Sequence, residues 1–579
     1  MGGRTPMLQD NRKMDRQALL GLVVGSVIIL AYFAFFLPWM YPPAERYQAP
    51  KTTQPPKQTA VKAPEQETPK TPQPSPPPIE TGEKALKTLP PAGAELVDNI
   101  VLENEEIKTI WTNEGAALKN ATLKKYKDYA DNDLRLFLPS KTTPRTLAID
   151  TMLDKYDLSH HLYQVKEVTP ERVSFQTTLE DGLRITKNIS LHKDGEYHLD
   201  VEILAENIAN TEISLKYSIV SASQICPEGT PEYDTASVVG MSLGTKTKFI
   251  QKTLGDLKKS PEVNESRGIT WAGGVDKYFA CVLKATTSDL VQSVTSKQVL
   301  EKDTKLGPNL LVSVGTNSFT LLPGGAEKHE YTLFLGPKQE KVLLEYGLVT
   351  LLNFGAFTPI SKGLLHVLNS FYHVIPNYGV DIIILTVLVK VCLFPLTRKS
   401  QMSMFKMQEL QPELKKLQEK YKDDKQRMGQ EQMALFKRHG VNPMSGCLPI
   451  VLQLPVFYAL FRTLQLSFEM RQAPFAFWIH DLSRPDMMFT LSSPLPFLGN
   501  YINVLPIIMA VASIAQMRLM PSNPDPKAQQ QQQLMKIMPV MFAFVLYHMP
   551  SGLLLYWTTS TILSVGEQLL IRRMAAKKK

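Results

Sequence analysis

The hydrophobic residues of this chain are gathered into a few long blocks that much more polar sequence separates. The first block, residues 18–37, contains no charged residue. About 20 such residues are enough to cross a bilayer as a helix. Pro38, Trp39 and Tyr41 follow it, and they suit a membrane interface better than the small residues of a signal-peptide cleavage site. We therefore expect a first transmembrane helix over 18–38, with a cleaved signal peptide as the alternative.

The other apolar blocks come late in the chain. They cover, in chain order, 380–396, 447–468, 502–520 and 537–571. The last block is long enough for two helices, and the residues from Met549 to Gly552 predict a turn inside it. Together with the first block, the pattern predicts about six membrane spans. We place the second transmembrane helix over 378–396 and the remaining four, with their loops, over 441–571.

Charged residues predict how the spans are oriented. The net charge is +9, from 64 basic and 55 acidic residues. Basic residues are concentrated in 1–17, between 398 and 438, and in the tail 572–579. Lys and Arg near spans stay mostly on the cytoplasmic side of a membrane. An even number of spans places all three stretches there, so we expect a multi-pass inner-membrane protein whose N-terminus and C-terminus are both cytoplasmic.

A linker and a β-rich domain lie between the first two spans. Residues 39–92 are rich in Pro, Lys, Gln, Glu and Thr, so they cannot bury a hydrophobic core and should be extended. From 93 to 340, short runs alternate between apolar and polar residues, as in LRITKNISL, EYHLDVEIL and ISLKYSIV. Turn signals such as Asp181-Gly182 and Asp194-Gly195 separate the runs. This pattern predicts an all-β sandwich.

The β-rich domain shows no sequence signature of catalysis. No triad spacing, phosphate loop or metal-ligand cluster stands out in it. The chain has only 4 cysteines, and they lack the CxxC spacing of metal sites. A bridge between Cys226 and Cys281 could form in an oxidising compartment, but two buried, unpaired residues are the simpler interpretation.

Two further stretches are expected to form helices outside the bilayer. Residues 341–377 are amphipathic, and their second leucine-rich run suits a helix lying on the membrane surface. Packing against the β-domain is an equal alternative for their first run. Residues 397–440 are rich in good helix formers and have a break at Asp423-Asp424, which predicts a cytoplasmic helical hairpin. Pro412 falls inside the first arm, where we expect a kink.

One ionisable residue lies deep inside an apolar block. Lys390, in ILTVLVKVCLFPL, costs a few kcal/mol at that depth, and such residues commonly serve function. Snorkelling of its side chain to the cytoplasmic interface is an equal alternative. Other spans carry further polar and aromatic residues, and Thr386 shares a helix face with Lys390. The candidate substrate groove consists of Lys390, Thr386, Gln453, Gln516, Tyr556 and Trp557. We expect no catalytic residue, no metal ligand and no cofactor.

Three long stretches are similar to the YidC/Oxa insertase family. The first begins at NYGVDIIILTVLVKVCLFPL and ends at YALFRTL. The other two read MRQAPFAFWIHDLSRPD and MPSGLLLYWTTSTILSVGEQLLI. They stand in the family's order, and the resemblance covers the chain from 340 to its end. The first span, the linker and the β-rich domain resemble the Gram-negative arrangement. The resemblance implies a periplasmic β-supersandwich domain and a five-helix insertase core with a groove open to cytoplasm and lipid.

The resemblance also bears on Lys390. In the family a positive residue, usually Arg, sits in the groove, and the matching position here is Lys390. Lys keeps the charge but lacks the planar, bidentate fork of Arg. Whether Lys390 fully replaces the usual Arg is therefore open.

The implied function is the insertion and folding of integral membrane proteins, alone or with the Sec translocon, without covalent chemistry. Expected partners are nascent membrane proteins, membrane lipids and the ribosome. The basic tail could reach ribosomal RNA, although a positive-inside tail is the simpler account of its lysines. Two other functions are considered: a channel or transporter, which needs a continuous polar path, and sugar binding or epimerisation in the β-domain, because the supersandwich also resembles sugar mutarotases. No small-molecule substrate is expected.

Overall fold

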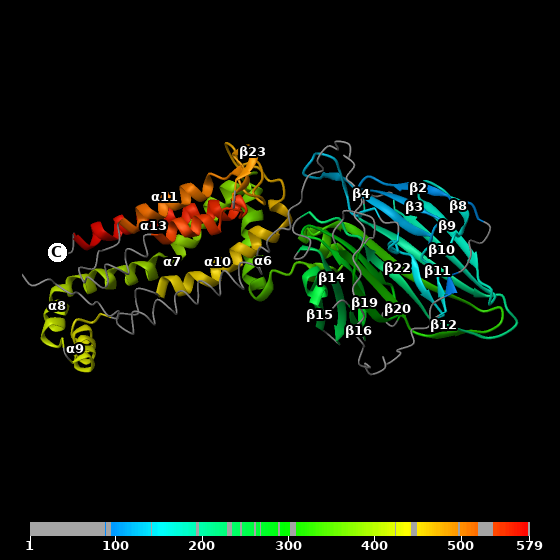
Figure 1. Ribbon diagram of the computed structural model, residues 1–579, viewed down its shortest axis with the longest axis horizontal. Helices are drawn as coiled ribbons and strands as arrows, with labels where there is room; N and C mark the ends of the chain where they lie inside the picture. The colour runs from blue at the N-terminus through cyan, green and yellow to red at the C-terminus, as the bar shows by residue number, and fades with distance from the viewer. Residues whose placement is uncertain are drawn as a thin grey trace, which may run out of the picture. The chain divides into compact units, whose positions relative to one another are not determined.

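The computed structural model describes residues 87–88 and most of 94–576. Within the second range it leaves out 140–141, 154, 193–195, 229–233, 244–245, 260–261, 267, 288–289, 301–307, 423, 442–447, 496–497 and 519–536. The expected first transmembrane helix, nearly all of the linker and the last three residues lie outside the described part. The chain from Ala85 onward forms one compact unit. It contains a β-domain up to residue 337 and a helical part from residue 340 (Figure 1).

Two large sheets form the body of the β-domain. The nine-stranded sheet has the order β15-β14-β17-β18-β22-β11-β10-β9-β8, and the seven-stranded sheet has the order β1-β7-β6-β13-β20-β19-β16. Strands β13, β19 and β20 of the second sheet lie against β14, β17 and β18 of the first, so the sheets pack face to face. A continuous hydrophobic core fills the space between them. The expectation of a β-sandwich is confirmed.

The strands of the nine-stranded sheet have these bounds: β8 Gln164–Val168, β9 Arg172–Thr178, β10 Leu183–Leu191, β11 His198–Asn207, β14 Ala236–Leu243, β15 Lys246–Thr253, β17 Ile269–Val275, β18 Phe279–Ala285 and β22 Ala326–Pro337. Those of the seven-stranded sheet are β1 Lys87–Thr88, β6 Ile149–Met152, β7 Tyr156–Asp157, β13 Tyr217–Ser223, β16 Glu262–Ser266, β19 Val291–Val299 and β20 Asn309–Thr316.

Smaller elements complete the β-domain. A four-stranded sheet contains β2 Asp98–Glu103, β3 Ile107–Thr112, β4 Ala117–Lys127 and β5 Asp133–Arg135. Strands β12 Ile213–Leu215 and β21 Phe319–Leu321 form a separate pair, and helix α4 spans Leu254–Lys259. Cys226 and Cys281 are both free thiols, and Cys281 Sγ donates to the carbonyl of Ser221 at 3.3 Å. The disulfide considered above is therefore absent.

The alternating runs behave differently once folded. LRITKNISL forms β10, whose residues alternate between buried and half-buried positions, and most of EYHLDVEIL falls in β11 beside it. ISLKYSIV is divided between β12 and β13, which belong to different sheets. Both fragments bury the same alternate positions, so alternation alone cannot reveal that the chain changes sheets.

Lys187 occupies a core-facing position of β10 and is fully buried. Its Nζ donates to the carbonyls of Gly115 at 3.2 Å, Ala116 at 2.9 Å and Leu147 at 2.5 Å. Burial lowers the pKa of Lys187 to about 7. The side chain thus joins β10 to the ends of two other segments by satisfying three buried acceptors.

The helical part begins with short elements that pack on the β-domain. They are α5 Glu340–Glu345, η2 Val349–Leu351 and η3 Gly355–Phe357. Leu343 and Phe354 belong to the hydrophobic core of the β-domain, so packing on that domain is confirmed for the first amphipathic run. Helix α6, Thr358–Tyr372, follows, and Ser361 Oγ donates to the carbonyl of Ala459 in α10 at 3.0 Å. Its buried face is thus covered by another helix.

The remaining helices are α7 Tyr378–Glu409, α8 Gln411–Lys420, α9 Lys425–Arg438, α10 Leu448–Leu466, η5 Phe468–Met470, α11 Leu505–Arg518 and α13 Ser551–Ala576, with a further helical stretch over 537–545. A hairpin of β23 Phe489–Leu495 and β24 Gly499–Ile502 precedes α11. Of the helices in the described ranges, α7 alone is long and apolar enough to span a membrane by itself, and α11 is a shorter apolar helix.

Helix α7 continues without a break through Pro395 to Glu409, beyond the expected span end at residue 396. The expected hairpin therefore consists of α8 and α9, which enclose a small core of Leu410, Leu414, Leu435, Phe436 and Val441. Asp424 caps α9 by accepting from the backbone N–H of Arg427 at 3.0 Å, which agrees with the expected break. The kink expected near Pro412 takes the form of a break, because α7 ends at Glu409 and α8 begins at Gln411. Pro412 lies in the first turn of α8, where its missing N–H has no helical partner to lose.

A buried ion pair connects the β-domain to the segment after α10. Arg471 Nη2 donates to Glu228 Oε1 at 2.5 Å, and only 3% and 6% of the two side chains are exposed. The Arg471 guanidinium also lies 5.2 Å from the ring centroid of Phe279 in β18. Phe468 packs edge-on against the same ring at 5.5 Å. The contact therefore combines charge pairing with apolar packing.

Replacing Lys187 with Met should destabilise the β-domain by about 2–3 kcal/mol, because the three carbonyls would remain buried without a donor. Hydrogen exchange of the β9–β11 amides in the full-length protein measures this effect. Lys166→Met, at an exposed position of β8, is the matched control and should leave exchange unchanged. Equal exchange in both variants would show that the carbonyls do not depend on Lys187.

Candidate functional site

The residues expected to form a groove lie on α7, α10, α11 and α13. Figure 1 shows α7, α11 and α13 running alongside one another, and α13 contacts α7, α10 and α11. Gly552 allows the start of α13 to approach the segment before β23, because a Cβ there would lie 3.0 Å from the carbonyl oxygen of Leu482. Helix α13 therefore packs against all three of the other helices that carry candidate residues.

Lys390 is directed toward α13. Its Nζ donates to Ser564 Oγ at 2.7 Å, and Ser564 Oγ donates to the carbonyl of Ser560 at 2.9 Å. The lysine is half-buried. This contact joins residues 174 positions apart and provides a polar connection between α7 and α13.

Glu567 is a second ionisable residue of this region, and the sequence analysis missed it. It lies three residues after Ser564 on α13, hence on the same side of that helix, and it interacts electrostatically with Lys390. Its Oε1 is buried without a hydrogen-bond partner among the described residues. An acidic residue inside the apolar run ILSVGEQLL was the signal that could have revealed it.

The polar contacts continue along α13. Tyr556 is 2% exposed, and its side chain interacts with those of Gln453 of α10 and Ser560. Tyr556, Ser560 and Ser564 are spaced four residues apart, so they share one face of the helix. We call this face of the helix the α13 polar line; it consists of Tyr556, Ser560, Ser564 and Glu567. Gln453 of α10 and Lys390 of α7 contact it from the neighbouring helices.

The other three candidates have different surroundings. Thr386 is 1% exposed, and its hydroxyl donates to the carbonyl of Ile382 in its own helix at 2.6 Å. Trp557 packs against the rings of Phe457, at a centroid distance of 4.9 Å, and Phe542, at 5.9 Å. The described hydrogen bonds and ion pairs do not include Gln516. None of these three residues takes part in the described hydrogen bonds of the polar line.

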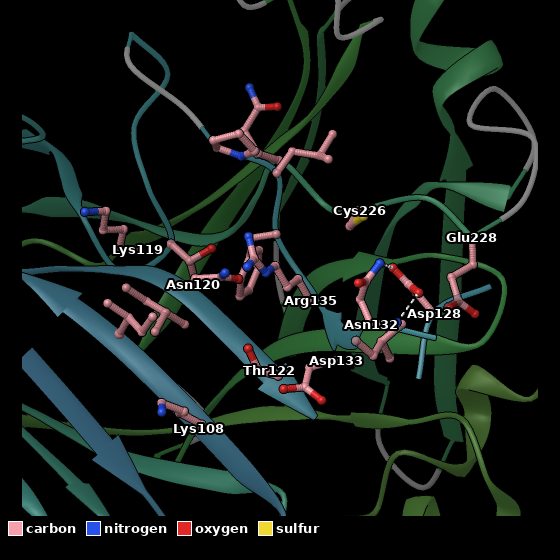
Figure 2. A pocket seen from close by; sticks show the side chains of 18 of the residues that line it. Lys108, Lys119, Asn120, Thr122, Asp128, Asn132, Asp133, Arg135, Cys226 and Glu228 are labelled. Atoms are coloured by element: carbon pink, nitrogen blue, oxygen red, sulfur yellow. Dashed lines mark hydrogen bonds between the residues drawn. The ribbon is translucent and has the colours of Figure 1, made fainter. Parts of the chain in front are cut away.

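The β-domain contains a cleft of about 1390 Å³, shown in Figure 2. Lys119 and Lys127 at this cleft form ion pairs, Lys119 with Asp98 and Lys127 Nζ with Asp133 Oδ1 at 2.6 Å. Cys226 also lines the cleft, and burial raises the pKa of its thiol to about 11. A protonated thiol is a poor nucleophile. The cleft is polar, but its groups are arranged as paired surface charges and not as a nucleophile with a base.

Comparison with known proteins covers both parts of the chain. Residues 370–578 match the family described as 60Kd inner membrane protein, and residues 99–367 match the YidC periplasmic domain. The "Membrane protein insertase YidC" of Syntrophus aciditrophicus is 31% identical over 97% of this chain and 100% of its own length. The protein of the same description from Pelobacter propionicus is 30% identical over 97% of this chain and 99% of its own length. The one from Syntrophobacter fumaroxidans is 34% identical over 71% of this chain and 72% of its own length.

Among solved structures, a galactose mutarotase related enzyme from Lactobacillus acidophilus has a TM-score of 0.31 and 12% identity over 42% of this chain and 97% of its own. A galactose mutarotase-like protein from Lactobacillus casei has a TM-score of 0.30 and 14% identity over 41% and 99%. Similarity at this level supports no conclusion about activity.

Replacing Lys390 with Ala should destabilise the packing of α7 on α13 by about 1 kcal/mol or more, because the half-buried hydrogen bond to Ser564 and the electrostatic interaction with Glu567 would both be lost. Adding Glu567→Gln should restore the electrostatic part of the loss. Hydrogen exchange of α7 and α13 in lipid nanodiscs measures both effects, and Lys399→Ala, at an exposed position of α7, is the control. No rescue by the second substitution would show that the two charges are not coupled.

Proposed function

The chain belongs to the YidC family of membrane protein insertases, and we propose that the α13 polar line with Lys390 forms the path along which it moves substrate segments. The protein is an inner-membrane insertase with a periplasmic β-domain. Its substrates are membrane proteins. The proposal concerns how the helical part performs this insertion.

The hydrogen bond between Lys390 and Ser564 is the observation that carries the proposal. It connects α7 to α13 and is continued by Ser560, Tyr556 and Gln453. A polar segment that crosses hydrocarbon leaves its polar groups unsatisfied, at several kcal/mol each. A line of hydroxyl, amide and ammonium groups offers replacement partners along part of that route. The free-energy barrier for moving the polar segment across the membrane is therefore lower.

A buried polar atom without a protein partner supports the presence of water beside this line. Glu567 Oε1 is buried and has no hydrogen-bond partner within the described ranges. Buried polar atoms are almost always satisfied by protein or by water. We therefore expect water to reach the region between α7 and α13. Water there would also keep Lys390 charged.

Lys390 then has two competing anionic partners. Glu567 balances it in the resting protein, and an acidic residue of the substrate tail takes over part of that role during passage. An ammonium is a compact charge with three rotatable donors, so it can exchange partners without the fixed geometry of Arg. The apolar segment of the substrate leaves sideways into lipid, where partition into hydrocarbon provides the driving force. No covalent chemistry is needed.

The topology and partners proposed from the sequence fit this mechanism. Six spans with both termini in the cytoplasm place the α8–α9 hairpin on the side from which substrates arrive. That hairpin carries many basic residues, and an exposed basic surface can contact the ribosome or anionic lipid. The Sec translocon is proposed as a partner for substrates with large periplasmic segments.

No specific observation favours the other candidate functions. A channel needs polar groups across the whole membrane, whereas the α13 polar line covers residues 556 to 567 only. A sugar epimerase needs a positioned acid and base, and the β-domain cleft is lined with paired charges.

Insertion should depend on the charge of Lys390. We expect Lys390→Arg to keep activity within about twofold and Lys390→Ala to lower insertion of acidic-tailed substrates about fivefold, which corresponds to about 1 kcal/mol of lost attraction. Lys390→Glu should lower it further, because it repels the same tails. The measurement is insertion of paired substrates that differ only in tail charge, at matched insertase levels.

Lys399→Ala again serves as the control and should not affect either substrate. If the Ala and Glu variants insert both substrates as well as the unchanged protein does, Lys390 is an interface anchor. The electrostatic mechanism would then be wrong, although the family assignment would stand.

Reporter fusions test the proposed topology. Fusions after residue 60, near 300 and near 482 should report the periplasm, and fusions near 425 and after 575 should report the cytoplasm, because basic segments resist translocation. A cytoplasmic signal near 300, in a stably expressed fusion, would overturn the even-span arrangement.

A further inference from the structure

Three side chains that can bind a metal meet at one end of the β10–β11 pair. Leu191 pairs with Leu199, so the next position outward brings His192 opposite His198. Asp200 lies two residues after His198 and hence on the same face of the sheet. One ligand atom from each of these three residues lies within 4.8 Å of the other two. Their side chains are 48%, 15% and 53% exposed in chain order, so dissolved ions can reach them.

The distances suit a tetrahedral ion. His192 Nε2 lies 2.8 Å from Asp200 Oδ2, and His198 Nε2 lies 3.9 Å from Asp200 Oδ1. Zinc–ligand bonds of about 2.0–2.1 Å with tetrahedral angles hold ligand atoms about 3.3 Å apart. The two observed separations lie on either side of that value, so small side-chain rotations are enough. We propose that His192, His198 and Asp200 bind a divalent transition-metal ion, with Zn²⁺ as the expected ion and water as its fourth ligand.

A carboxylate behind His198 supports this assignment. His198 Nδ1 lies 3.0 Å from Glu196 Oε2 and 3.3 Å from the hydroxyl of Tyr346. Metal-binding histidines usually donate their second ring N–H to such a group, which fixes the ring and the tautomer. With Nδ1 protonated, the lone pair of Nε2 is on the side of Asp200.

The backbone on both sides of the site is held by one buried amide. Asn104 is 8% exposed, and its Nδ2 donates to the carbonyl of His192 at 2.9 Å and of Glu196 at 3.0 Å. Its Oδ1 accepts from the backbone N–H of Ile107 at 2.7 Å. The two strand ends are therefore positioned before any ion binds, which lowers the entropic cost of binding.

A bound ion would join β10 to β11 beside the start of the helical part. Tyr346, the C-cap of α5, accepts from the backbone N–H of Tyr197 at 3.0 Å and touches the site through His198. No metal ligand was expected from the sequence, in which no metal-ligand cluster stood out, and the spacing H-x₅-H-x-D matches no common metal motif. Only the strand register brings the three side chains together. The inference does not depend on the insertion mechanism.

Titration of the full-length protein with ZnCl₂ tests the site. The protein is purified in detergent without a polyhistidine tag and treated with EDTA before the metal is added. We expect one Zn²⁺ per chain with a dissociation constant in the micromolar range. The double variant His192→Gln/His198→Gln should lose this binding. Asp200→Asn should weaken it at least about tenfold, and Asn104→Ala should weaken it less, because it loosens the site without removing a ligand.

His160→Gln is the matched control. His160 is also partly exposed and lies 3.0 Å from a carboxylate, that of Glu114, but it belongs to no group of three metal ligands in the described part of the chain. The control should bind Zn²⁺ like the unchanged protein. Equal thermal unfolding of all variants in EDTA shows that they are folded. A dissociation constant in the millimolar range, or equal Zn²⁺ binding by the double variant, would overturn the proposal. It would show that the three side chains form only surface hydrogen bonds.

Discussion

A polar group taken away from water must find a partner inside the protein, and two lysines show how differently the chain meets this constraint. Lys187 in the β-domain donates to three backbone carbonyls and is completely enclosed. Lys390 in the helical part donates to one serine hydroxyl and remains half-buried. An ammonium has three N–H donors. The first lysine is therefore satisfied by the fold alone, whereas the second retains capacity for water or for a passing substrate.

The same contrast separates the two parts of the molecule in function. In the β-domain the acceptors of Lys187 are backbone carbonyls, whose positions are fixed by the fold. This favours a single conformation of the lysine and of the segments that it joins. The helical part relies on side chains such as Ser564 and Glu567, which can rotate and exchange partners. A protein that handles many different substrates benefits from partners that can be replaced. The insertion path proposed above therefore lies in the helical part.

The Arg471–Glu228 pair links these two parts. It joins residues 243 positions apart and is almost completely buried. Removal of one partner from such a pair leaves an uncompensated charge, whereas the intact pair contributes orientation more than net stability. The nearby carboxyl of Asp276 is also buried, which raises its pKa to about 6, and it accepts from the backbone N–H of Glu228. The β-domain is thus held to the segment after α10 by a specific polar contact.

Patterns within short segments were sufficient to predict much of this protein. Alternation identified β10 because period two corresponds directly to a sheet with one buried face, and the late apolar blocks predicted helices. Only the tertiary structure decided which distant residues became partners: Lys390 with Ser564, and His192 with His198 and Asp200. It also decided that ISLKYSIV divides between two sheets and that Pro412 begins a helix. Such outcomes depend on which faces pack together across the fold, and local periodicity contains no information about that.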